Sequence, residues 1–141
     1  MNIQYSSELS DFQLNNPENT TTWIKEAIQA EGKDLGDLLI HFVDNKTILE
    51  INRQFLNHSY FTDIITFNYN FLDVLSGEIF ISIEAVRENA GKCKGKTFLR
   101  ELYRVIIHGI LHLLGYQDAT DDEKELMRKK EDQQLTYLDW L

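Results

Sequence analysis

The segment from Thr97 to Leu114 constrains the fold most strongly, because it predicts a helix that is apolar around most of its circumference. Its apolar residues form two adjacent rows, Leu102, Ile106, Ile110 and Leu113 in one and Tyr103, Ile107, Leu111 and Leu114 in the other. Such a helix has to be buried by other elements on several sides. We therefore expect it to lie at the centre of the molecule.

The rest of the chain alternates between strand-like and helix-like patterns. These patterns predict strands at 2–5, 37–44, 62–70 and 77–83, and helices at 17–33, 45–57, 97–114 and 121–135. Ser76 and Gly77 indicate a turn between the third and fourth strands, which we expect to pair. The sum predicts an α+β fold with a small mixed sheet covered by helices.

Length and composition predict a single domain that spans residues 1–141. The first residues lack the basic and apolar regions of a secretory signal. The longest apolar run, 105–114, is much shorter than the roughly 20 residues of a membrane span. We therefore expect a cytoplasmic protein without membrane contact. Cys93 is the only cysteine, which excludes a disulfide framework and a thiolate zinc cluster.

The charge distribution is uneven along the chain. The net charge of −9 argues against general attraction to nucleic acid. Residues 84–104, however, contain six basic and three acidic side chains, which gives a local charge of +3. Half of these basic residues, Lys92, Lys94 and Lys96, form a loop directly before the apolar helix. This loop is either a solvated surface segment or a contact for RNA.

One polar stripe interrupts the apolar helix, and it consists of Glu101, Arg104, His108, His112 and Gly115. Spacings of three and four place these residues on one face. A polar stripe on a buried helix has to face a cleft, a partner or an internal network. Two histidines four residues apart can direct their nitrogens at one point, as in helical zinc sites.

A third ligand for such a site is available just beyond the helix. Gly115 can end the helix in a left-handed cap and turn the chain back, which brings Asp118 within reach of the histidines. Three protein ligands leave a fourth position for water, as in hydrolytic zinc sites. In the alternative interpretation, His108 and His112 are core residues bonded to the backbone, and Asp118 caps the last helix.

Three segments carry a family resemblance. HGILHLLGYQD at 108–118 resembles the signature HGxLHLxGYDH of the bacterial YbeY proteins. INRQFLNHSYFTDIITF at 51–67 is similar to that family's LNxxYRxxDxPTDVLSF segment, and LSGEIFISIEAVRENA at 75–90 is similar to its LGDIxIS strand and the following helix. The resemblance spans roughly residues 38 to 131 in the family's order.

The resemblance implies a zinc-dependent endoribonuclease that cleaves single-stranded RNA in 16S ribosomal RNA 3′-end maturation and ribosome quality control. It implies ribosomal RNA as a partner, together with a small-subunit ribosomal protein or an assembly GTPase, and we expect a monomer. His108 and His112 would bind one zinc ion, and Asp118 would take the place of the family's third histidine. These three residues are the expected catalytic centre. An anionic third ligand makes a bound water less acidic and makes other divalent metals more competitive.

A second departure concerns substrate binding. Where the family has an arginine, this chain has Leu56, so an obvious phosphate-binding group is absent. His58, Arg104 or the loop with Lys92, Lys94 and Lys96 would have to substitute. Three residues from the strand segments, Thr62, Asp63 and Glu78, are expected either to line the cleft or to cap turns.

Two other functions stay open at this point. The first is a ribosome-assembly binding factor whose metal is largely structural. The second is a metal-dependent hydrolase with another substrate. Peptidase chemistry of the HExxH type is disfavoured, because Gly109 stands where such enzymes place their glutamate base.

Overall fold

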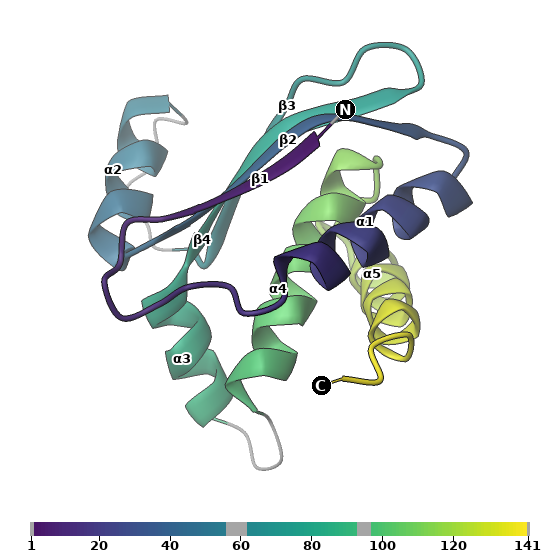
Figure 1. The fold of residues 1–141 in the computed structure, drawn as a ribbon. Coiled ribbons are helices and arrows are strands. Elements are labelled where there is room, and N and C mark those ends of the chain that lie inside the picture. The colour runs from purple at the N-terminus through teal and green to yellow at the C-terminus, as the bar shows by residue number, and fades with distance from the viewer. Residues whose placement is uncertain (1, 56–61, 93–96, 141) are drawn as a thin grey trace.

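The computed structural model describes residues 2–55, 62–92 and 97–140 of the chain (Figure 1). The elements follow in the order β1 (Asn2–Ser7), α1 (Pro17–Ala30), β2 (Asp34–Val43), α2 (Asn45–Phe55), β3 (Ile64–Asn68), β4 (Val74–Ser82), α3 (Ile83–Gly91), α4 (Phe98–Leu113) and α5 (Asp121–Leu135). The predicted elements are all present, and α3 corresponds to the helix implied by the family resemblance. The expected α+β fold is confirmed.

The four strands form one mixed sheet in the order β1-β2-β4-β3. The strand β2 is parallel to β1 and to β4, whereas β3 and β4 are antiparallel neighbours. The expected pairing of the third and fourth strands is therefore confirmed. Because β3 is at one end of this order, it is an edge strand, and it lies next to α4.

Helices lie on both sides of the sheet (Figure 1). The helices α1 and α4 pack on one face, where Leu38, Ile40, Ile79 and Ile81 belong to the main core. The helix α2 packs on the other face over a smaller cluster of Val43, Ile48 and Ile65. This alternation follows from the two-residue period of strands, which sends successive side chains to opposite faces.

The helix α4 is central, as the sequence predicted. It contacts α1, α3, α5, β3 and β4. All residues of its two apolar rows are buried except Leu114, which is partly exposed. Gly109 permits a close approach to the sheet, because a Cβ atom there would lie 2.8 Å from Cδ1 of Ile64 and 3.2 Å from Cδ1 of Ile79. The helix face that carries the histidines is consequently held next to β3.

The helix α4 ends as expected at Gly115, which has a φ of 107°. The amide of Tyr116 donates to the carbonyl of Leu111, and the amide of Gly115 donates to that of His112. This pair of bonds is the Schellman motif, which reverses the chain at a left-handed residue. The helix α5 then begins after Thr120, whose side chain accepts from the amide of Glu123 in a capping box. Thr120, and not Asp118, is thus the N-cap of the last helix.

The predicted turn at Ser76 and Gly77 is wrong, because both residues lie within β4. The chain reverses earlier, between Asn68 and Val74. There the side chain of Asn70 accepts from the amide of Ser76 and donates to the carbonyl of Leu113, both at 2.8 Å. These side-chain bonds fix the turn and attach it to the end of α4. In the described part of the chain, no helix combines the length and apolar character needed to cross a bilayer.

Candidate metal centre

Three side chains converge beside the C-terminal end of α4. The Nε2 atoms of His108 and His112 are 3.0 Å apart, and each lies 3.3 Å from Oδ2 of Asp118. The histidines meet because residues four apart share a face of the helix. Asp118 joins them because the Schellman motif at Gly115 turns the chain back across that face. All three side chains are partly exposed.

The arrangement fits a small divalent cation. Ligand atoms around a tetrahedral zinc ion, with bonds of about 2.0 to 2.1 Å, lie about 3.3 Å from one another. The three observed separations of 3.0 to 3.3 Å match that spacing. Two imidazole nitrogens and one carboxylate oxygen are also a donor set that zinc accepts. The group formed by His108, His112 and Asp118 can therefore hold one metal ion.

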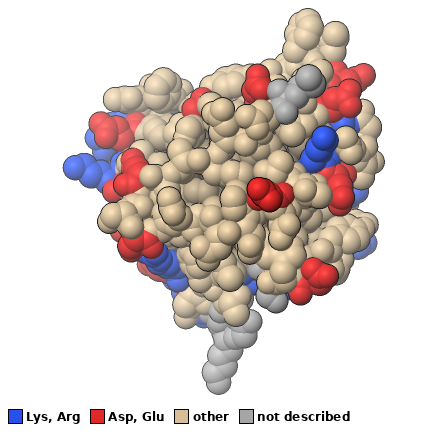
Figure 2. Space-filling view, viewed as in Figure 1, with Lys and Arg blue, Asp and Glu red and all other residues tan. Residues whose placement is uncertain are grey.

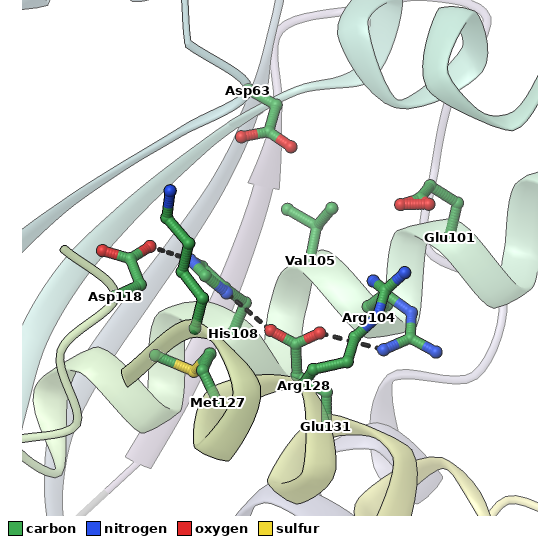
Figure 3. A pocket seen from close by; sticks show the side chains of 10 residues that line it. Asp63, Glu101, Arg104, Val105, His108, Asp118, Met127, Arg128 and Glu131 are labelled. Carbon is green, nitrogen blue, oxygen red and sulfur yellow. Dashed lines mark hydrogen bonds and ion pairs between the residues drawn. The ribbon is translucent and has the colours of Figure 1, made fainter. Parts of the chain in front are cut away.

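A buried carboxylate supports the first of these histidines (Figure 3). Oε2 of Glu131, from α5, lies 2.7 Å from Nδ1 of His108, and the Glu131 side chain is only 6% exposed. This bond places the proton of the neutral imidazole on Nδ1 and leaves the lone pair of Nε2 directed toward the other two ligands. The orientation of His108 is thus set by a residue from another helix.

Arg104 compensates the charge of this buried carboxylate. Its Nη1 donates to Oε1 of Glu131 at 2.9 Å, and its Nη2 donates to Oδ1 of Asp132 at 2.6 Å. The Arg104 side chain is 14% exposed. A buried charge is costly unless it is paired and hydrogen-bonded, and both conditions are met here. Arg104 and Glu131 therefore join α4 to α5 behind the metal centre.

The environment of His108 also changes its basicity. Burial lowers the pKa of His108, but the hydrogen bond and negative charge of Glu131, with the charges of Asp118 and Asp63, outweigh this effect. The pKa of His108 consequently lies above its ordinary value. The same negative charges that favour a proton on this imidazole favour a metal cation at its Nε2 atom.

Two hollows meet at the metal centre. A cavity of about 480 Å³ opens between α4 and α5, and its lining includes His108, Asp118 and Glu131. A smaller hollow of about 320 Å³ opens toward β3, and its lining includes His108, His112 and Asp118. The candidate ligands thus face accessible space on two sides. Such a site leaves room for a substrate beside the metal.

Asp63 lines both hollows and lies immediately before β3. Its carboxylate points into the larger cavity in Figure 3. Burial raises the pKa of Asp63, and the nearby His108 only partly offsets this increase. A carboxyl group in a cleft whose pKa is raised by burial is a candidate for a proton-transfer role. Thr62 lines the smaller hollow. Both residues thus line the cleft, which is one of the two roles expected for them from the sequence.

The residues expected to bind substrate are only partly described. His58, Lys94 and Lys96 lie outside the described residues, as does Leu56. Lys92 is exposed and lines a separate hollow of about 640 Å³ that also reaches Thr62 and Asp63. Arg104 lines the cavity of about 480 Å³ between α4 and α5, although two of its nitrogens are bound to carboxylates.

The expectation that Glu78 lines the cleft or caps a turn is wrong. Glu78 lies within β4, and its carboxylate bonds to Nε2 of His41 at 2.8 Å and to the hydroxyl of Tyr69 at 3.2 Å. Its strand neighbour Ile79 faces α4 and the main core. Because successive residues of a strand face opposite sides, Glu78 points to the α2 side of the sheet, away from the histidines.

Sequence reasoning missed Glu131 as part of the site. Glu131 lies between Met127 and Leu135 at spacings of four, and all three are buried on one face of α5. An acidic residue on an otherwise apolar helix stripe is the signal that could have identified it, because such a residue needs a partner. The partner itself depends on how α5 packs against α4.

Comparison with known proteins decides the family. The model of the family described as Endoribonuclease YbeY matches residues 3–139. The chain belongs to the YbeY family.

Relatives and a solved structure agree with this assignment. A Flavobacterium psychrophilum protein named Endoribonuclease YbeY is 44% identical over 133 residues, 94% of each chain. A Bacteroides thetaiotaomicron protein of the same name is 48% identical over 116 residues, which is 82% of this chain and 84% of that protein. A Thermotoga maritima protein solved in solution has a TM-score of 0.64 and 28% identity, with 96% of this chain and 90% of that chain covered. The fold of the Thermotoga maritima protein is thus shared over nearly the whole chain.

Proposed function

We propose that this YbeY-family protein is a zinc-dependent endoribonuclease that cleaves single-stranded RNA. The observation that carries the proposal is the convergence of His108, His112 and Asp118 at separations of 3.0 to 3.3 Å, beside two open hollows. Three protein ligands with an open side are typical of a catalytic metal site, whereas structural zinc sites are closed by four. The names of the relatives supply the substrate class.

A bound zinc ion would neutralise charge on a phosphoryl oxygen and make a coordinated water more acidic. The protein's own groups would orient the metal ligands and transfer protons. Glu131 keeps Nε2 of His108 available and correctly oriented, through the bond to Nδ1. Asp63, with its raised pKa, is placed to take a proton from the attacking water or to return one to the leaving oxygen.

The packing of α4 supports a nuclease over a peptidase of the HExxH type. The position after His108 is Gly109, and it faces the side chains of Ile64 and Ile79 at close range. A glutamate there would clash with the sheet and would not reach the metal centre. The general base of such peptidases therefore has no equivalent at this position.

The biological role that we propose is 3′-end maturation of 16S ribosomal RNA and ribosome quality control. We propose that the protein acts in the cytoplasm as a monomer, with a small-subunit ribosomal protein or an assembly GTPase as its partner. A second candidate is an assembly factor with a largely structural metal. Arg104 was expected to bind phosphate, but its guanidinium is bonded to Glu131 and Asp132. This observation favours the assembly factor.

Cleavage by the wild type and by the His112→Ala variant separates the two candidates. We expect zinc-loaded wild type to cleave a labelled single-stranded oligoribonucleotide, to leave the duplex intact, and to lose activity in His112→Ala. A zinc-loaded wild type that binds RNA but cleaves none would instead support the assembly factor. The His41→Ala variant is a matched control, since His41 lies on the opposite face of the sheet.

A further inference from the structure

We propose that Lys124 and Arg128 of α5 form a phosphate-binding subsite for the backbone of single-stranded RNA. This inference rests on the proposed ribonuclease function, which supplies an RNA strand at the metal centre. The subsite would hold a phosphate next to the one at the metal. It would supply, from α5, the positive charge that Leu56 does not provide.

The position of the two side chains carries the inference. Lys124 and Arg128 both line the cavity of about 480 Å³ that His108 and Asp118 also line. They are four residues apart on α5, so they share one helix face. Both are exposed, and no ion pair between described residues involves either of them. Their charges are therefore available to a ligand that enters this cavity.

The third cation of the cavity is already engaged. Arg104 directs Nη1 to Glu131 and Nη2 to Asp132, and its side chain is 14% exposed. A phosphate would have to share this guanidinium with both carboxylates, one of which also supports His108. Among the described residues, the lining cations whose charge is not already paired with a carboxylate are thus Lys124 and Arg128. An arginine can bind a phosphate through two nitrogens, and a lysine adds a point charge.

Local charge matters here because the chain as a whole is acidic. The net charge is −9, and in Figure 2 the basic side chains of that face lie near its margins, mixed with acidic ones. The cavity itself is lined by the carboxylates Asp63, Glu101, Asp118 and Glu131. Without a cation at the cavity, these groups would repel an RNA strand. Lys124 and Arg128 offset that repulsion beside the candidate metal ligands.

The double variant Lys124→Gln/Arg128→Gln tests the subsite against a control that removes the same charge. The control is Lys25→Gln/Lys129→Gln, which changes two exposed residues that do not line this cavity. The probe is a fluorescein-labelled single-stranded oligoribonucleotide. Its binding to zinc-loaded protein is followed by anisotropy over a series of salt concentrations, before appreciable cleavage, and its cleavage is followed in parallel.

We expect the cavity variant to bind the oligonucleotide about tenfold more weakly, because it loses two charged contacts to phosphate. The slope of log affinity against log salt should flatten by about 1.4, the value for two phosphate contacts on a single strand. The zinc dissociation constant should not change, since neither side chain belongs to the group that could hold the metal. The control variant should retain wild-type affinity and slope.

Two outcomes would overturn the subsite. In the first, the cavity variant keeps wild-type affinity and salt slope. In the second, both double variants weaken binding equally, which would mean general attraction and no localised site. Failure of the ribonuclease proposal gives a different result, namely zinc-loaded wild type that cleaves no RNA. In that case the anisotropy comparison still decides whether these two side chains bind the RNA backbone.

Discussion

The carboxylate of Glu131 lies 2.7 Å from Nδ1 of His108, although the two residues are 23 positions apart and belong to different helices. Oε1 of the same carboxylate accepts from Arg104 at 2.9 Å, so Glu131 is held in place from both sides. A metal-binding histidine whose other nitrogen meets a carboxylate keeps one tautomer and one ring orientation.

Glu131→Gln should weaken zinc binding. An amide in this position cannot offset the positive charge at His108, and such outer partners typically contribute about 10- to 100-fold in metal affinity. The measurement is the zinc dissociation constant, from competition with a chelator. Asp132→Asn is the matched control, because Asp132 binds the same Arg104 but makes no contact with a candidate ligand. An equal loss in both variants would mean that the ion pair stabilises the fold and does not tune the histidine.

The raised pKa of His108 predicts a pH dependence for metal-free protein. A folded-state pKa above the unfolded value of about 6.5 stabilises the fold fully below that pH, and this stabilisation is lost as the pH rises through the folded-state pKa. We therefore expect the free energy of urea unfolding, measured with chelator present, to fall as the pH rises above about 6.5. The fall should be smaller in His108→Asn. Identical pH profiles for wild type and variant would contradict the role of Glu131 and Asp118 in raising this pKa.

Asp118→His should change metal preference without abolishing binding. A third imidazole removes the anionic ligand, and imidazole favours zinc whereas carboxylate favours harder ions such as Mn²⁺. We expect the ratio of the Mn²⁺ to the Zn²⁺ dissociation constant to rise on the order of tenfold. Asp118→Ala serves as the control and should weaken both metals. If Asp118→Ala bound zinc as tightly as the wild type, Asp118 would not be a ligand.

Asp63→Asn should slow cleavage and leave metal binding intact. If Asp63 transfers a proton in the reaction, its loss should lower kcat by about 100-fold or more. The zinc dissociation constant should not change, because Asp63 is not in the group that converges on the metal. The control is Asp139→Asn, which changes an exposed carboxylate that lines neither hollow at the metal centre and should leave kcat unaltered. A kcat near the wild-type value in Asp63→Asn would exclude the proton-transfer role.

The apolar rows of α4 and the four-residue spacing of His108 and His112 made the central helix and the meeting of the two imidazoles predictable from sequence. The left-handed cap at Gly115 was also predictable, because a helix end of this kind depends on local backbone geometry. Local patterns also identified the other helices and strands in outline, except α3, which only the family resemblance implied.

Long-range packing explains what the sequence did not predict. The contact between Glu131 and His108 depends on the placement of α5 against α4, which no local pattern specifies. The turn before β4 depends on Asn70, whose side chain reaches both Ser76 and Leu113. The wrong expectation for Glu78 arose because alternation along β4 assigns residues to two faces, but only the tertiary fold decides which face carries α4.

The most direct test of a zinc centre at His108, His112 and Asp118 is the titration of chelator-treated protein with zinc while RNA cleavage is measured. A zinc centre at these residues predicts no cleavage by metal-free protein, full activity at one equivalent of zinc, and no recovery in His112→Ala at any zinc concentration used. Cleavage that persists without metal, or that returns equally in His112→Ala, would contradict it.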